Sequence, residues 1–272
     1  MSLDLNEWLN LFLRWFHVIA GITWIGQTYL FNWLERVLEA PSGAKSKPNI
    51  SGELWMVHGG GFYLVEKQKW PEIMPRRLHW FKWEAGLTWI TGVLLLGIVY
   101  WAGAPLLDYA SPLSRIQGVA ISLAVLVGGW IAYNLVWSSV LGRNEAVGTA
   151  ACWLLVVALA YGLDRVLSDR AAYLHIGAMF GTIMVANVWM RIIPSQKKMM
   201  AITEAGGTPD PTLGARAKRA SKHNTFMSVP LMFTMISNHF PATTFGQEHA
   251  PLILGGMVLI GWVGAKLIRD YA

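Results

Sequence analysis

WLNLFLRWFHVIAGITWIGQTYLFNWL, residues 8–34, is the stretch of sequence that decides the fold. As a helix it would be about 40 Å long, at 1.5 Å per residue, which is enough to cross the roughly 30 Å hydrocarbon core of a bilayer. It nevertheless contains Arg14, with His17 one turn later. A basic residue at mid-helix costs roughly 2.5–3.5 kcal/mol on insertion scales, so a span that keeps such groups commonly uses them to bind something.

The composition extends this interpretation to the whole chain. Of its 272 residues, 54% are hydrophobic and only 14% are charged, against about 25% charged in soluble domains. The 15 tryptophans suit the membrane–water interface, where an indole keeps one wet edge. We therefore attribute the net charge of +6 to the membrane association of the chain, and we expect no nucleic-acid partner. The single cysteine, Cys152, excludes an internal disulfide, a C-x-x-C-H haem attachment and a cysteine-held iron–sulfur cluster.

Seven stretches are apolar and long enough to cross a bilayer, and they must be helices because backbone groups in lipid have to be hydrogen-bonded within the segment. We expect one all-α membrane domain over residues 1–272, a polytopic helical bundle of about seven transmembrane helices with long loops at 35–77 and 194–222. The expected spans are 8–34, 78–101, 116–140, 146–163, 171–193, 223–240 and 250–269.

The loop charges predict the orientation of the bundle. Seven Lys or Arg residues fall in 35–77, seven in 191–222, one in the turn 141–145 and two in the C-terminal tail, which makes 17 on one side. The other side has only three. Positively charged loops stay in the cytoplasm, so we expect the N-terminus outside and the C-terminus inside.

Histidines recur in or beside these spans, several with glycine close by. A haem iron needs an imidazole with flat space next to it, so the pattern indicates a membrane protein that binds one or two non-covalent b-type haems. The alternative is a set of helix–helix contacts in which each imidazole bonds a neighbouring carbonyl. The candidate haem iron ligands are His17, His79, His175, His223 and His239.

The first span also offers a polar face. Arg14, His17 and Trp24 follow a spacing of three or four residues and share one side of the helix with Gly21. This side should turn into the bundle, since it is the polar and small one. Arg14 is predicted to pair with a haem propionate or an anionic substrate.

Two further residues are predicted to be catalytic. Glu84 is the carboxylate placed clearly inside a span, where it would carry protons; the alternative is a salt bridge with Lys82 or Arg14. His58 precedes three glycines, which allow a backbone to approach a ligand closely, although a structural turn is equally consistent. The β-prone residues after them predict a hairpin or an interfacial segment.

Several motifs resemble the membrane domain of the bacterial integral-membrane urate oxidases, also described as urate hydroxylases and linked to cytochrome c. The resemblance runs from about residue 10 to 270. The motifs are RWFHVIAGITWIG (14–26), HGGGFY with EK (58–67), LHWFKWEA (78–85), SKHNTF (221–226) and SNHFP (237–241).

The resemblance implies oxidation of urate to 5-hydroxyisourate, a step of purine catabolism, in the bacterial cytoplasmic (inner) membrane. In the family, electrons leave through haem to a cytochrome c domain that follows the membrane part. This sequence ends after the seventh span without C-x-x-C-H, so the acceptor is expected to be a separate cytochrome c or another electron acceptor. Urate is flat and anionic and needs a cation, aromatic faces and amide groups. The expected substrate-binding residues are Arg14, Trp24, Trp83 and Asn238.

Other functions remain open from the sequence. A membrane electron-transfer subunit would bind haem without substrate chemistry of its own. A small-molecule transporter would use Arg14 and Glu84 to line a path. A haem-binding oxidase that acts on porphyrinogens is a further alternative.

Overall fold

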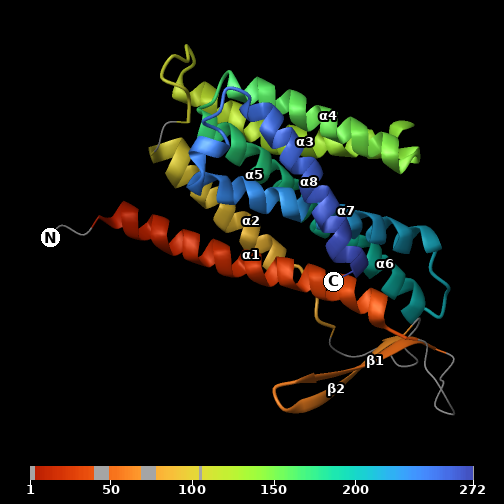
Figure 1. The fold of residues 1–272 in the computed structure, drawn as a ribbon. Coiled ribbons are helices and arrows are strands. Elements are labelled where there is room, and N and C mark those ends of the chain that lie inside the picture. Colours follow the sequence, from red (N-terminus) through yellow and green to blue (C-terminus); the bar gives the residue numbers. More distant parts are fainter. Residues whose placement is uncertain (1–3, 40–48, 69–77, 104–105, 272) are drawn as a thin grey trace.

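The computed structural model describes residues 4–39, 49–68, 78–103 and 106–271 and forms a bundle of long helices with one small hairpin (Figure 1). The expected all-α membrane bundle is confirmed. A π-helical stretch, Gly97–Gly103, extends α2, and a second, Val188–Ile192, joins α5 to α6. The helices are α1 (Leu5–Val37), α2 (Trp83–Leu96), α3 (Arg115–Ser138), α4 (Glu145–Asp164), α5 (Asp169–Asn187), α6 (Ile193–Glu204), α7 (Pro211–Ile236) and α8 (Ala250–Tyr271).

Six helices in the described part of the chain are long and apolar enough to cross a membrane, with α5 and α6 counted as one continuous helix, Asp169–Glu204. Helix α7 is not among them because its first half is polar and carries Arg216, Lys218 and Arg219. The expected span 223–240 covers its second half and the 3₁₀ turn Ser237–His239. The chain is thus a multi-pass membrane protein.

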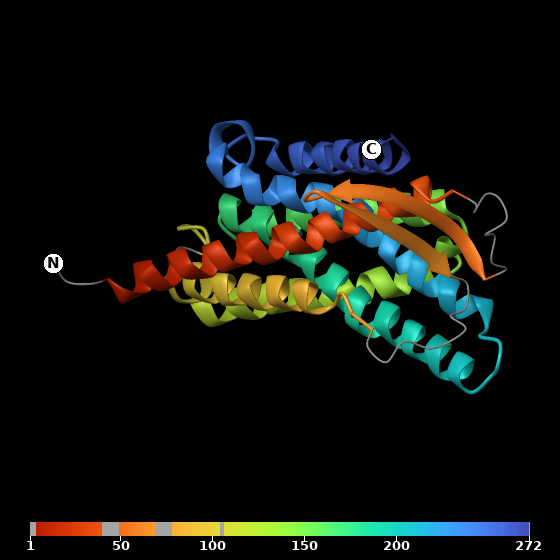
Figure 2. The same ribbon diagram turned by 90° about the horizontal axis from the view of Figure 1, so that it is seen from below.

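Helix α5 occupies the centre of the bundle, between α3 and α7 (Figures 1 and 2). Together with α6 it forms the most buried of the candidate spans: 61% of the residues in the most apolar stretch of Asp169–Glu204 are buried. Helix α1 lies at the edge, packed mainly along α2, and buries only Trp24 and Leu34. Its many exposed apolar side chains, such as Phe12 and Ile22, are the surface that hydrocarbon covers in a membrane.

Glycines set the closest helix crossings. A Cβ at Gly261 of α8 would lie 2.9 Å from Cδ and 3.0 Å from the backbone nitrogen of Pro230 in α7. Small residues at such crossings allow helices in lipid to gain van der Waals contact, which is a main source of their association. At Gly21 of α1 the packing is looser, since an added Cβ would lie 3.9 Å from Cγ2 of Thr88 in α2, an ordinary van der Waals contact.

The two ends of the bundle differ in their charges. We call the end that holds the hairpin and the turn between α6 and α7 the basic end, and the other the opposite end. At the basic end Lys222 forms an ion pair with Glu145, and Asp210 caps α7. The Asp210 carboxylate accepts hydrogen bonds from the hydroxyl and backbone N–H of Thr212, at 2.6 and 2.8 Å, and these lower the pKa of the Asp210 carboxyl.

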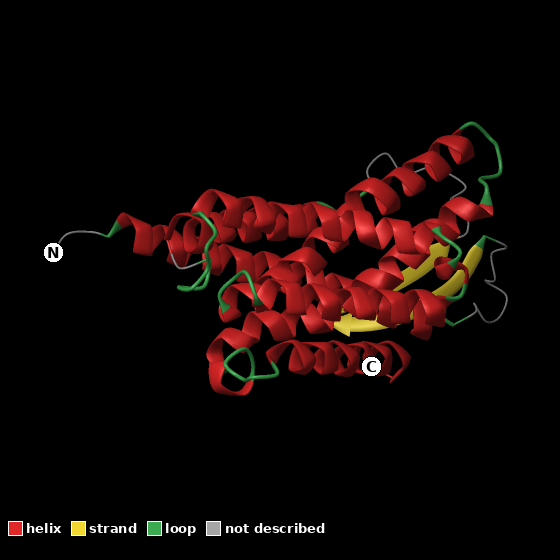
Figure 3. Ribbon diagram, turned by 90° about the horizontal axis from the view of Figure 1, so that it is seen from above, coloured by secondary structure: helices red, strands yellow, loops and turns green. Residues whose placement is uncertain are grey.

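The hairpin predicted in the first long loop is confirmed (Figure 3). Strands β1 (Ile50–His58) and β2 (Gly61–Gln68) pair antiparallel around a turn at Gly59 and Gly60. Both turn residues have positive φ, 58° and 80°, which glycine adopts without steric cost and which matches the twist of a two-residue hairpin loop. The first two glycines after His58 therefore make the turn, and the third, Gly61, begins β2.

Candidate functional site

An apolar cavity of about 560 Å³ lies between α3 and α4, with α5, α7 and α8 behind it. Gly128 and Ala132 of α3 leave this space because they have little or no side chain, whereas Gly129 lets the side chain of Met179 pack directly against α3. Ala124 and Leu155 line it and are exposed, so the cavity opens between α3 and α4 onto the surface that faces lipid. Its size is that of a small-molecule or cofactor pocket, roughly 300–1,000 Å³.

The polar groups of the cavity gather near the basic end. His223 of α7 lines the wall, and its Nδ1 lies 2.7 Å from the hydroxyl of Tyr133 in α3. The ring of Trp137 packs 4.2 Å from the imidazole, centroid to centroid. Tyr133 thus holds one ring nitrogen of His223, and Nε2 is the nitrogen that remains for a ligand.

A buried amide pair supports Tyr133 from behind. Asn187, the last residue of α5, donates from Nδ2 to the Tyr133 hydroxyl at 3.2 Å and to Oδ1 of Asn224 at 2.9 Å. Asn224 in turn donates to the carbonyl of Met184 at 2.9 Å. Asn187 is fully buried, yet its Oδ1 has no partner. Buried amides in a span are costly unless paired, so this network is a specific feature of the site.

The π turn Val188–Ile192 connects this network to a second polar group. Arg191 on the turn places its guanidinium 5.2 Å from the ring centroids of both Trp130 and Tyr133. Trp189, two residues earlier, points to α2, where its ring meets Trp83 at 5.4 Å in an edge-on contact. Short π-helical turns commonly mark functional sites. This one lies between two polar groups, the Tyr133–His223 network and the group around Glu84.

The second polar group surrounds Glu84 at the start of α2. Its Oε1 lies 3.7 Å from Nε2 of His79 and 3.4 Å from the amide nitrogen of Gln27 in α1. Its Oε2 is buried without a partner. Next to it, Lys82 lies over two indoles, 5.6 Å from Trp83 and 5.3 Å from Trp189. Glu84 therefore has the imidazole of His79 as its neighbour, in place of the Lys82 or Arg14 salt bridge considered from the sequence.

His17 and His175 lie towards the opposite end and contact different helices. Nδ1 of His17 is 3.0 Å from the carbonyl of Thr88 and 3.0 Å from the hydroxyl of Thr91, both in α2. His175 is fully buried, with Nε2 2.6 Å from the hydroxyl of Ser122 and Nδ1 2.7 Å from the carbonyl of Ala171. His17 keeps one nitrogen for a ligand, whereas both nitrogens of His175 are held by the protein.

The substrate residues expected from the sequence fall in two places. Arg14 is exposed near the start of α1 and donates to Asn10 at 2.6 Å. Asn238, beyond the end of α7, accepts from Arg170 at 2.6 Å, which also places it at the opposite end. Trp83 belongs to the Glu84 group, and Trp24 is a residue of α1 whose side chain is buried in the core.

The remaining candidate histidines, His58, His79 and His239, are accessible. His58 is exposed at the hairpin turn, and the His79 side chain is 69% exposed just before α2. His239 is exposed in the 3₁₀ turn after α7. No described contact joins any of these three to the cavity.

Some residues of the site were not among those expected. Tyr133, Asn224 and Arg191 enter it from three separate elements. A signal for them existed in the sequence, since each is a polar residue in or at the edge of an apolar span. That signal does not say which of the many polar residues meet.

The side chains of the site can be compared with the ligands that a metal ion or a haem requires. Within the described ranges no cluster of three or more His, Cys, Asp or Glu side chains could hold a bare metal ion. A macrocycle that brings most of its own iron ligands needs only one or two from the protein. The His223 imidazole, oriented by Tyr133 on the wall of an apolar cavity, fits that requirement.

The fold and this site define a polytopic helical membrane protein. Inside its bundle, buried polar side chains gather beside an apolar cavity. The family described as Urate oxidase N-terminal matches residues 4–271, so the chain belongs to that family. No curated protein and no solved structure matches it. Membership of this family indicates a urate-related function.

Proposed function

We propose that this chain is a membrane-bound, haem-dependent oxidoreductase that oxidises urate to 5-hydroxyisourate, in the bacterial cytoplasmic membrane, and passes the electrons to a cytochrome c-type acceptor. Family membership over residues 4–271 supports urate as the substrate. The observation that carries the redox part is the pairing of His223 with Tyr133 at the apolar cavity. The reaction converts urate and one water into 5-hydroxyisourate and releases two protons and two electrons.

A b-type haem would lie in the cavity, held by Nε2 of His223, with Met179 and Met227 also on the wall. When bound, it supplies the one-electron steps that amino-acid side chains do not. Tyr133 orients the imidazole, as partners of ligating histidines commonly do. The apolar walls would keep water from the bound haem.

Urate would bind in the Glu84 group. The indoles of Trp83 and Trp189 offer flat faces for the purine, and Lys82 between them offers a positive charge for the urate anion. Glu84 Oε2, buried and unpartnered, is the group that would accept a proton from the substrate or its attacking water. The π turn joins this group to the cavity through Trp189 and Arg191.

The direct test is anaerobic addition of urate to the purified protein while the haem spectrum is recorded. The proposal expects a Soret band in the isolated protein and its shift to the reduced form on adding urate, with no change on adding an equal amount of xanthine. A sample without a Soret band would remove haem from the proposal. Haem that urate does not reduce would favour an electron-transfer subunit instead.

A further inference from the structure

The outer part of the β1–β2 hairpin is made of uncharged, mostly large apolar residues. Residues 54–65 contain no Asp, Glu, Lys or Arg, whereas Glu53 and Glu66 lie directly next to them. The strand register pairs Trp55 with Leu64, and pairs Val57 with Phe62. Because side chains alternate between the two faces of a hairpin, these four share one face. We call them the hairpin face.

The hairpin face is exposed in the described structure. The exposed fractions are 65% for Trp55, 69% for Val57, 78% for Phe62 and 44% for Leu64. Tyr63, on the other face, is 52% exposed. A contiguous apolar surface of this kind marks an interaction site. A two-stranded hairpin alone has little stability in water, so a partner that covers this face would also stabilise it.

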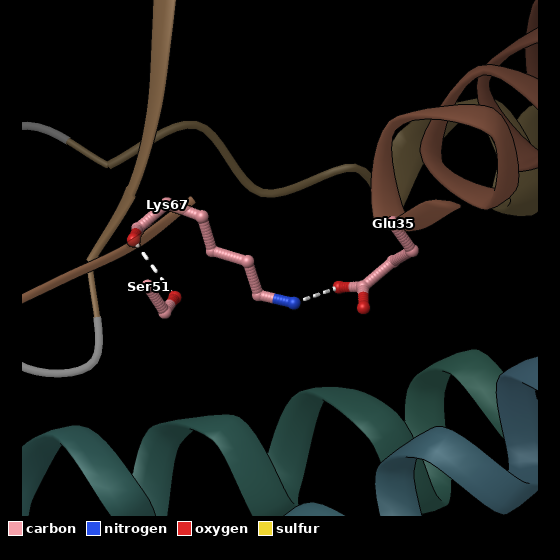
Figure 4. Close-up of polar contacts among 3 residues, drawn as sticks. All are labelled: Glu35, Ser51 and Lys67. Atoms are coloured by element: carbon pink, nitrogen blue, oxygen red, sulfur yellow. Dashed lines mark hydrogen bonds and ion pairs between the residues drawn. The ribbon is translucent and has the colours of Figure 1, made fainter. Parts of the chain in front are cut away.

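The base of the hairpin is fixed to the end of α1. Lys67 Nζ lies 2.5 Å from Glu35 Oε1, and the Ser51 hydroxyl donates to the Lys67 carbonyl at 2.9 Å (Figure 4). Glu39 and Glu53 exchange backbone hydrogen bonds of 3.2 and 2.9 Å. These contacts make the direction of the hairpin follow from that of the membrane helix.

That direction leads back towards the membrane. Figures 1 and 2 show the hairpin folded back beside the bundle, with its turn pointing towards the end at which α1 begins. Helix α1 is itself a candidate span with an exposed, apolar outer side. The hairpin is therefore brought to the edge of the lipid-facing surface.

We propose that the hairpin face inserts into the boundary between lipid headgroups and acyl chains and anchors the basic end of the bundle to the membrane surface. Trp, present in this face as Trp55, is enriched at that boundary, and the apolar tip flanked by the charged residues Glu53 and Glu66 suits shallow insertion. The hydrocarbon core is too deep a location, because the free strand edges need water or headgroups as hydrogen-bond partners. The proposal does not depend on urate oxidation.

The test measures the position of the tip in vesicles. Cys152→Ala gives a chain without cysteine, into which Phe62→Cys is introduced at the tip and Gln68→Cys, as the matched control, at the base of the same hairpin. Each is labelled with the fluorophore NBD and reconstituted into phosphatidylcholine–phosphatidylglycerol vesicles, with or without lipid that carries a doxyl quencher near the headgroup. We expect doxyl quenching at 62 to exceed that at 68 severalfold, and iodide quenching to show the reverse order.

Two outcomes would overturn the proposal, and a further variant tests the apolar character of the face. Equal access of iodide to both labels would overturn the proposal, since the tip would then lie in water. Shielding of position 62 from iodide without doxyl quenching would overturn it too, because protein, such as a second copy of the chain, would then cover the tip. Adding Val57→Glu to the Phe62→Cys chain should reduce the doxyl quenching by half or more, because a carboxylate opposes insertion.

Discussion

The hydroxyl of Tyr133 lies 2.7 Å from Nδ1 of His223, although the two residues are 90 positions apart in the chain. A ligand role for Nε2 requires the tautomer in which Nδ1 carries the proton and donates it to Tyr133. Tyr133 also accepts from the amide of Asn187, so its oxygen is held from two sides. The hydrogen bond thus fixes the ring orientation of the candidate haem ligand and is compatible with the tautomer that the ligand role requires.

Tyr133→Phe should weaken haem binding by about 10- to 100-fold, the usual effect of removing the partner of a ligating histidine. The measurement is haem content per polypeptide together with a haem titration of the apoprotein. Tyr161→Phe, on the outer side of α4 and 38% exposed, is the matched control and should bind haem normally. Equal affinity in the two variants would show that Tyr133 does not position the ligand.

His223→Ala should abolish haem binding in the cavity, because the variant has no imidazole on that wall. His17→Ala should also remove a large share of the bound haem. Nδ1 of His17 is held by α2, and its Nε2 is the nitrogen that would ligate a second haem. Haem content and the absorption spectrum of each variant decide the matter. Unchanged haem in His17→Ala would leave His17 as a helix–helix contact, and unchanged haem in His223→Ala would move the haem out of the cavity.

Glu84→Gln should slow the reduction of haem by urate by roughly 10²- to 10⁴-fold, which is the usual contribution of a proton acceptor. The amide keeps the shape of the side chain and its contact with Gln27, so haem content should stay the same. Stopped-flow absorbance under anaerobic conditions gives the rate. Glu248→Gln, exposed in the loop before α8, is the control. A normal rate in Glu84→Gln would remove this carboxylate from the reaction.

Ser122→Ala should lower the free energy of unfolding by about 1–3 kcal/mol, the cost of leaving a buried polar group unpaired. Its hydroxyl is the partner of His175 Nε2 and also accepts from Trp101 Nε1 at 2.9 Å. Unfolding in mixed micelles by added SDS measures the change. A double-mutant cycle with His175→Ala isolates the pair; zero coupling would show that the hydrogen bond contributes nothing.

Gly261→Ala should destabilise the bundle by about 1–3 kcal/mol, because the added methyl group would meet the backbone of Pro230 and push α8 from α7. Gly256→Ala on the same helix is the matched control, since nothing lies within 4 Å of its added Cβ. The same SDS unfolding assay compares the two. Equal stability of both variants would mean that the crossing of α7 and α8 is looser than the structure shows.

Much of the fold could be predicted because its causes are local. A helix in lipid satisfies its backbone within the segment, so an apolar run of about 20 residues is enough to define it. The hairpin could be predicted as well, because Gly59 and Gly60 can adopt the positive φ values that its turn needs. Less predictable was the place at which one helix becomes another: α5 passes through the π turn into α6 without a break.

The candidate site could be predicted only in its chemistry. The sequence indicated histidines, a carboxylate and aromatic residues inside spans, and the structure places His223, Glu84 and Trp83 in two neighbouring polar groups. It also shows that Arg14 and Asn238 lie towards the opposite end. Helical periodicity shows which residues lie on the same face of a helix. It does not show which other helix packs against that face.

The sequence by itself determined that this chain is a multi-pass helical membrane protein with ionisable groups inside it. Only the tertiary structure decided that α3 and α4 separate into a cavity, that Tyr133 reaches His223 there, and that the hairpin returns towards the membrane. The physical reason is that burial in lipid depends on each segment alone, whereas helix pairing depends on the fit of side chains from distant parts of the chain.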